Sequence, residues 1–215
     1  MRSTPPVVIF DLDGTLIDSR PPLLASLNEV LWVHGLRALT ETELVDCMGR
    51  GLAGLVARTL RLLDADLPVE PLLVLLRERY DVHCAASVRP FAGVDAALKR
   101  LDGTHRLALC TNKPRVPTDA VLHHLGWAHR FEVVAALGDV AVAKPHPALL
   151  QRVLDTMHIG PEQAVMVGDT RNDAGAAAAV GIRFFAVAWG YAQEPVHTLG
   201  AHAVLPNLAA LRKWI

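Results

Sequence analysis

The chain has 215 residues, of which 52% are hydrophobic, and this is enough apolar material for one large domain or for a domain that carries an insert. Its 21 basic and 22 acidic residues are mixed along the sequence and give a formal net charge of -1, which excludes the basic surface expected of a nucleic-acid-binding protein. A short apolar run near the N-terminus and the lack of any apolar stretch of transmembrane length predict a globular, cytoplasmic protein that binds no membrane.

The first predicted element is a strand over residues 7–10, where four apolar residues that favour β structure follow one another. Such a strand is buried on both faces, and Asp11 should lie at its C-terminal end. Asp13 and Asp18 follow closely, so that like charges are crowded at the place where open α/β sheets bind ligands. We expect Asp18 to cap the helix that begins after it.

Residues 19–87 show the periodicity of helices and contain no convincing strand. Within this block, helices are predicted in residues 20–35, 40–50, 51–68 and 69–87. A dinucleotide-binding pattern occurs at residues 49–54, which read GRGLAG, but it follows a helical segment instead of a strand. We interpret it as a flexible turn between helices, in which Arg50 is available to contact an anion.

Helices and strands alternate through the rest of the chain. The predicted helices are residues 94–104, 117–127, 147–158 and 173–181, and the predicted strands are residues 105–111, 131–137, 164–170 and 183–190. This alternation predicts an α/β fold with a Rossmann-like parallel sheet built from residues 1–18 and 88–215. The helical block of residues 19–87 is then an insertion after the first strand.

Polar residues follow further predicted strands, and in a parallel sheet these strand ends share one edge. Four carboxylates around a divalent cation, a lysine to offset the remaining charge, and hydroxyl and amide donors for phosphate oxygens would make a phosphoryl-transfer site. The residues that supply these groups are Asp11, Asp13, Thr111, Asn112, Lys144, Asp169 and Asp173.

The motifs DLDGT, TNKP, AKPHP and GDTRND occur in the order and spacing of the haloacid dehalogenase superfamily, which the whole chain resembles. The inserted block resembles the α-helical cap domain of that superfamily. Within the superfamily, the segments RPFAGV, VGDTRND and WGY are most similar to the phosphoglycolate phosphatase branch.

The resemblance implies that Asp11 is a nucleophile that attacks phosphorus to form an aspartyl-phosphate. Asp13 would protonate the leaving alcohol and then deprotonate the attacking water. The implied cofactor is Mg²⁺, held by the Asp11 carboxylate, the Asp13 backbone carbonyl and the Asp169 carboxylate.

The resemblance also assigns roles to the residues around these acids. Thr111 and Asn112 would hold phosphate oxygens, and Lys144 would offset the clustered negative charge. Asp173 would orient water or Lys144, and Gly14 would allow the tight turn after the first acid pair.

These roles predict a magnesium-dependent phosphatase whose partner is a small phosphomonoester, most simply 2-phosphoglycolate, with Arg50 binding the carboxylate of the leaving group. The alternatives are a phosphatase of another sugar phosphate, a phosphosugar mutase and a catalytically silent phosphate-binding module. Asp13 argues against a dehalogenase and against a silent module, because neither needs a second acid. Gly168 and Asp169 stand where mutases tend to carry the pair ED. The sequence leaves the oligomeric state open.

Overall fold

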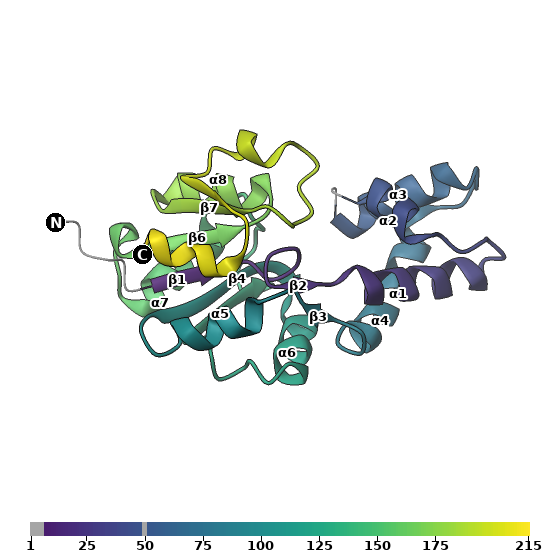
Figure 1. Cartoon of the computed structure of the whole chain (residues 1–215). Coiled ribbons are helices and arrows are strands. Elements are labelled where there is room, and N and C mark those ends of the chain that lie inside the picture. The colour runs from purple at the N-terminus through teal and green to yellow at the C-terminus, as the bar shows by residue number, and fades with distance from the viewer. Residues whose placement is uncertain (1–6, 49–50) are drawn as a thin grey trace. The chain divides into compact units, whose positions relative to one another are not determined.

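The computed structural model describes residues 7–48 and 51–215, which form two compact units (Figure 1). The core unit contains the chain up to Asp18 together with Arg89–Ile215, and the helical unit is Ser19–Val88. Val88 therefore belongs to the helical unit, one residue beyond the boundary expected from the sequence. None of the helices in the described part of the chain combines the length and the hydrophobicity that a membrane-spanning segment needs.

A six-stranded sheet forms the centre of the core unit, with the strand order β5-β4-β1-β6-β7-β8 and every neighbouring pair parallel. Its strands are β1 (Val7–Phe10), β4 (Arg106–Pro114), β5 (Val133–Leu137), β6 (Ala164–Gly168), β7 (Arg183–Val187) and β8 (Ala203–Leu205). The edge strand β8 had no prediction from the sequence, because its three residues are too few to show a period.

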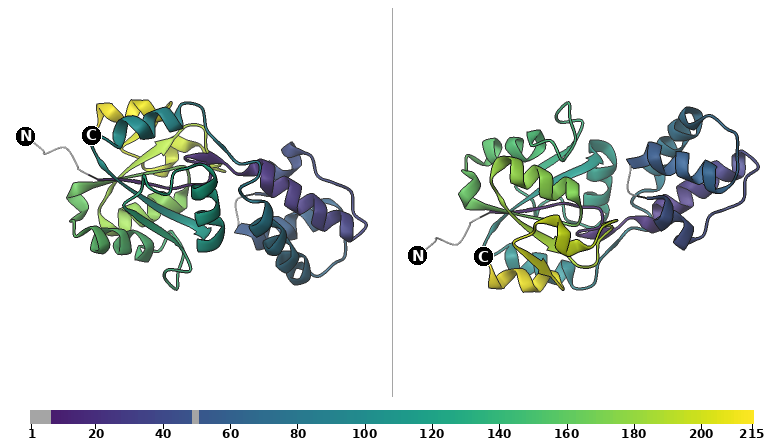
Figure 2. Two further views of the ribbon diagram at one scale, coloured as in Figure 1. Left: turned by 90° about the horizontal axis from the view of Figure 1, so that it is seen from below. Right: turned by 90° about the horizontal axis from the view of Figure 1, so that it is seen from above.

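Helices cover both faces of this sheet, as Figure 2 shows. The elements are α5 (Val94–Leu101), α6 (Arg115–His124), α7 (Ala148–Met157) and α8 (Arg171–Val180), with short 3₁₀ helices η1 (Pro161–Gln163), η2 (Val196–Leu199) and η3 (Leu208–Lys213). Helices α7 and α8 contact each other and pack on one face of the sheet. The connections through α5 and α6 run along the sheet in the opposite direction, from β1 to β4 and from β4 to β5, and the usual right-handed crossover places these two helices on the other face. The predicted α/β fold is confirmed.

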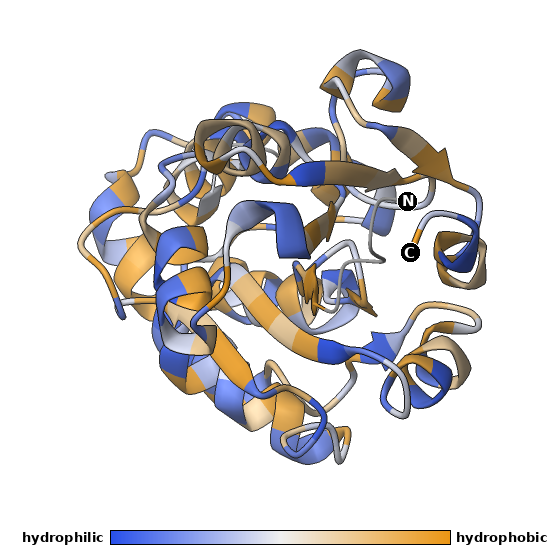
Figure 3. Ribbon diagram, turned by 90° about the vertical axis from the view of Figure 1, so that its left-hand side faces the viewer, coloured by the Kyte–Doolittle hydropathy of each residue, from blue (hydrophilic) through white to orange (hydrophobic). Residues whose placement is uncertain are grey.

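The sheet is buried on both faces because its strands are apolar on both sides, a property that Figure 3 shows as hydrophobic colouring along the sheet. In β1, Val7 and Ile9 join the cluster formed with α7 and α8, and Val8 and Phe10 alternate with them toward the opposite face. All four side chains are fully buried. This burial fixes β1 as the central strand and thereby fixes the position of Asp11.

The helical unit consists, in its described residues, of α1 (Arg20–Val33), α2 (Glu41–Cys47), α3 (Gly51–Leu62) and α4 (Val69–His83). Helix α2 begins with a capping box, in which Thr40 and Glu43 each bond the other's backbone N–H. Helix α1 packs against α4 through its periodic leucines. Gly51–Gly54 form the first turn of α3, which agrees with the helix predicted over residues 51–68 and not with the flexible turn expected there. Residues 49 and 50, the first half of that turn, lie outside the described residues.

A two-stranded antiparallel ribbon lies where the chain leaves and rejoins the core unit. Its strands are β2 (Ile17–Asp18) and β3 (Arg89–Pro90), and Asp18 is paired with Arg89. Phe91 continues the ribbon by donating its backbone N–H to the Leu16 carbonyl at 3.0 Å. Asp18 is thus a strand residue, and Ser19 occupies the N-cap of α1, so the expectation that Asp18 caps this helix is wrong.

Candidate active site

Three neighbouring strands bring acidic and hydroxyl side chains to one edge of the sheet. Asp11 directly follows the central strand β1, Thr111 lies near the end of β4, and Asp169 directly follows β6. Because β4 and β6 are the two hydrogen-bonded neighbours of β1, these side chains surround Asp11 from both sides. The backbone N–H of Asp11 donates to the Val167 carbonyl at 2.9 Å, which extends the sheet by one residue at this point.

Lys144 lies at the centre of the cluster and is completely enclosed. Its Nζ donates to Asp11 Oδ1 at 2.8 Å, to Asp173 Oδ1 at 2.6 Å and to the Cys110 carbonyl at 2.6 Å. These three bonds use all three protons of the ammonium group. Burial alone would lower the pKa of Lys144, but the charges of Asp11 and Asp173 outweigh it and raise the pKa above its ordinary value. The lysine is therefore a permanent cation.

Asp11 and Asp169 have too little positive charge around them to balance their own negative charge. Burial raises the pKa of Asp11 to about 7 even though Lys144 acts in the opposite direction. Burial, reinforced by the charges of Asp173 and Asp11, also raises the pKa of Asp169 well above its ordinary value. One lysine does not balance three buried carboxylates, so the site is suited to bind a further cation.

The donor atoms fit a cation that prefers oxygen ligands. Carboxylate oxygens of Asp11, Asp169 and Asp173 lie within 4.8 Å of one another. However, Asp173 Oδ1 accepts from Lys144, and its Oδ2 accepts from the backbone N–H of Thr170 at 3.0 Å and of Asp169 at 3.3 Å. The carboxylate oxygens of Asp11 and Asp169 are consequently more available to a cation than those of Asp173. Asp173 instead links Lys144 to the start of α8.

Asp13 has a different cationic partner from Asp11. The Nζ atom of Lys113 lies 3.1 Å from Asp13 Oδ1 and 3.3 Å from Asp13 Oδ2. The lysine side chain is 2% exposed, whereas the Asp13 side chain is 28% exposed. The sequence reasoning missed Lys113, although it is the third residue of the TNKP motif that was singled out.

The side-chain amide of Asn112 is bonded to the backbone of Lys144. Nδ2 donates to the Lys144 carbonyl at 2.9 Å, and Oδ1 accepts from the Lys144 N–H at 2.8 Å. Asn112 thereby fastens the loop that carries the buried lysine to the end of β4. The predicted contact of Asn112 with phosphate oxygens stays a prediction.

Gly14 is required where the chain turns after the acid pair. It has φ +85°, and a Cβ atom at this position would lie 2.1 Å from Asp169 Oδ2. The next residue, Thr15, is fully buried, and its hydroxyl lies 3.5 Å from Asp11 Oδ2 and 3.4 Å from Asp169 Oδ1. The sequence patterns assign no role to Thr15, although it is the last residue of the DLDGT motif.

The segment after β7 also contributes to the site. The Tyr191 N–H donates to Asp169 Oδ2 at 2.7 Å, and the Tyr191 hydroxyl donates to Asp18 Oδ1 at 2.7 Å. Trp189 Nε1 donates to the Thr15 carbonyl at 3.2 Å. The motif WGY therefore holds one of the site carboxylates and the ribbon at the same time, a function that no periodicity indicates.

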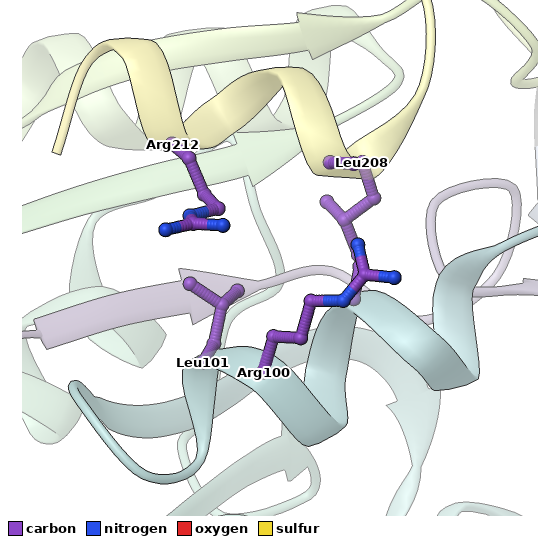
Figure 4. A pocket seen from close by; sticks show the side chains of 6 residues that line it. Arg100, Leu101, Leu208 and Arg212 are labelled. Carbon is purple, nitrogen blue, oxygen red and sulfur yellow. The ribbon is translucent and has the colours of Figure 1, made fainter.

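Arg50 is outside the described residues, so its predicted contact with substrate stays a prediction. A small hollow between α5 and η3 is lined by Arg100, Leu101, Leu208 and Arg212 (Figure 4). Its volume of about 10 Å³ is near the minimum needed for one water molecule, and none of the site residues lines it.

Comparison with known proteins agrees with this arrangement. The family model for haloacid dehalogenase-like hydrolases matches residues 8–187. A phosphoglycolate phosphatase of Rhodospirillum rubrum is 37% identical over 98% of this chain and 91% of its own length. An N-acetylmuramic acid 6-phosphate phosphatase of Pseudomonas aeruginosa is 30% identical over 86% of this chain and 82% of its own.

A solved structure shows the same architecture. The crystal structure of a predicted phosphoglycolate phosphatase from Haemophilus somnus superposes with a TM-score of 0.87 at 25% identity, covering 97% of this chain and 96% of the other. The family match spans β1 to β7, and thus every strand that carries a residue of the site. The chain belongs to the haloacid dehalogenase-like hydrolase family.

Proposed function

We propose that the chain is a magnesium-dependent phosphatase that hydrolyses a small phosphomonoester through an aspartyl-phosphate intermediate. The observation that carries this proposal is the environment of the two acids after β1. Asp11 is buried against Lys144, and Asp13, two residues later, is partly exposed and paired with a separate lysine. Two carboxyl groups in such different surroundings are suited to two different roles in one reaction.

In the first step, an oxygen of the Asp11 carboxylate attacks phosphorus. The bond from Asp11 to phosphorus forms while the ester bond breaks, and Asp13 gives its proton to the departing alkoxide. In the second step, Asp13 takes a proton from water as the water oxygen attacks phosphorus. The bond from Asp11 to phosphorus then breaks, which releases inorganic phosphate and restores both acids.

The residues that would hold Mg²⁺ are Asp11 and Asp169 through their carboxylates and Asp13 through its backbone carbonyl. All three offer oxygen, the ligand type that Mg²⁺ prefers. When bound, the ion would supply positive charge that stabilises the phosphoryl group in the transition state. The raised pKa values of Asp11 and Asp169 support this role, since both acids lack a sufficient positive partner.

Thr111 is our candidate for contact with the phosphoryl group. It is buried at the end of β4, and its hydroxyl oxygen accepts the Lys113 N–H at 3.1 Å. The hydroxyl proton remains available for a phosphate oxygen. Lys144 acts differently, because it keeps Asp11 in place and offsets part of the charge of the acid cluster.

The substrate we favour is 2-phosphoglycolate. The names of several relatives at 33–37% identity, among them the Rhodospirillum rubrum protein, support it. We propose that the helical unit, Ser19–Val88, serves as a cap that selects the leaving group, with Arg50 as the predicted partner of the glycolate carboxylate.

A second substrate deserves a direct comparison, because one relative is named for N-acetylmuramic acid 6-phosphate. The test is a comparison of kcat/KM for the two compounds with purified chain and Mg²⁺. A preference for 2-phosphoglycolate by orders of magnitude is the expected result. The reverse preference would overturn the substrate and leave the phosphatase chemistry intact.

The reaction class is tested separately with p-nitrophenyl phosphate, which reports phosphoryl transfer without demanding a particular leaving group. We expect release of p-nitrophenolate and inorganic phosphate with Mg²⁺ and none after chelation. No turnover of any phosphomonoester would indicate a phosphate-binding module instead. Conversion of a sugar phosphate into its isomer, without release of phosphate, would indicate a mutase.

A further inference from the structure

Lys113 is a buried cation whose position is fixed from several directions. Its backbone N–H donates to Thr111 Oγ1 at 3.1 Å, and its carbonyl accepts the Thr118 hydroxyl at 3.3 Å. The side chain is enclosed and ends at Asp13, with Nζ within 3.3 Å of both carboxylate oxygens. A strand end anchored in this way has little freedom to move its lysine.

The two lysines of the site contact different acids. The ammonium group of Lys144 donates its three hydrogen bonds to Asp11, Asp173 and the backbone carbonyl of Cys110. Lys113 contacts the remaining acid of the first motif, Asp13. A buried ammonium group is costly unless it is paired, so Lys113 and Asp13 stabilise each other's placement.

We propose that Lys113 is a positioning residue that holds the Asp13 carboxyl group in the direction from which it protonates the leaving oxygen. This role rests on the proposed function, in which Asp13 is the acid. Contacts to both oxygens restrict rotation about the last side-chain bond of Asp13, which a single contact would not do. A catalytic group misplaced by about 1 Å loses roughly 10²-fold in rate, so the restraint has a measurable consequence.

A comparison of leaving groups distinguishes the positioning of Asp13 from a purely structural role of Lys113. An alkyl phosphate releases a strongly basic alkoxide, which needs the proton of Asp13, whereas p-nitrophenolate leaves as a stable anion without it. The value of kcat/KM includes every step up to the departure of the alcohol. Loss of Lys113 should therefore lower kcat/KM for the alkyl ester much more than for the aryl ester.

The experiment measures kcat/KM of both esters, with 2-phosphoglycolate as the alkyl substrate, in the wild type, Lys113→Met, Lys113→Arg and Asp13→Asn. We expect Lys113→Met to lose roughly 10²-fold on the alkyl ester and only about threefold on p-nitrophenyl phosphate. Lys113→Arg should recover most of the alkyl activity, because the charge and the donors are kept. Lys99→Met is the matched control, since Lys99 is exposed on α5 and paired only with Asp95 among its described neighbours.

The double variant Lys113→Met, Asp13→Asn completes a cycle. If Lys113 acts through Asp13, the double variant is no slower on the alkyl ester than Asp13→Asn alone. Equal losses on both esters in Lys113→Met, or additive losses in the double variant, would overturn the positioning role. If Lys113→Met does not fold, the alkyl-to-aryl ratio of Lys113→Gln decides in its place. A wild type inactive on every ester would instead refute the proposed function.

Discussion

The stability of the metal-free protein should depend on pH through Asp11. Burial raises the pKa of Asp11 from 3.8 to about 7, so the folded chain keeps this proton where the unfolded chain has lost it. The stability from this group is therefore fully present below pH 3.8 and disappears as the pH rises through about 7. Between pH 5 and pH 8, the corresponding loss is about 3 kcal/mol, because each pKa unit corresponds to about 1.4 kcal/mol.

The assay is urea unfolding of the chelated protein at pH 5 and at pH 8, in the wild type and in Asp11→Asn. The variant keeps the shape of the side chain but cannot ionise, so the difference between the two proteins reports the ionisation of Asp11 together with its effect on Asp169. We expect the wild type to lose about 3 kcal/mol more than the variant over this interval. Addition of Mg²⁺ at pH 8 should recover stability in the wild type, because the ion binds the folded carboxylates. Equal pH dependence in the two proteins would refute the electrostatic reasoning.

Three further predictions concern the chemistry. Asp11→Asn should abolish turnover, whereas Asp13→Asn should accumulate phosphorylated protein from p-nitrophenyl phosphate, which intact-mass spectrometry after rapid quenching detects. Substantial steady-state activity in Asp11→Asn would contradict the mechanism. Phosphatase activity should vanish on chelation, return with Mg²⁺ and be inhibited by Ca²⁺, because the larger and looser coordination shell of Ca²⁺ misplaces the nucleophile. Full activity after exhaustive chelation would point to metal-free chemistry. Gly14→Ala should weaken Mg²⁺ binding by about 10- to 100-fold, because the added Cβ atom would displace Asp169, and calorimetric titration with Mg²⁺ measures the change. An unchanged affinity would mean that the close approach of the Gly14 backbone to Asp169 is not needed.

The sequence was informative wherever function coincides with the end of a strand. Asp11, Thr111 and Asp169 each follow or end an apolar run, and parallel strands bring such ends to one edge. The regular alternation of strands and helices predicted a parallel sheet without any tertiary information. This part of the site could be predicted because it depends on local pattern and on a general rule of topology.

The sequence was uninformative where a side chain's partner depends on loop geometry. The side-chain amide of Asn112 is bonded to a residue 32 positions later, a partner that no local pattern indicates. Tyr191 reaches Asp169 and Asp18 from a loop after β7, over separations that no periodic pattern encodes. Asp18 was expected to cap a helix, but it lies in the short ribbon, where it pairs with Arg89. Such contacts become visible only when the chain is folded.

The ribbon of β2 and β3 has a consequence for how this architecture can diversify. Because Asp18 and Arg89 are direct partners, the chain leaves the core and returns to it at a single place. A segment joined through adjacent ends can be lengthened, shortened or exchanged without moving the strands on either side. The catalytic edge and the helical insert are therefore separable in evolution, so that recombination or grafting at residues 18 and 89 offers a route to new substrates on an unchanged set of acids.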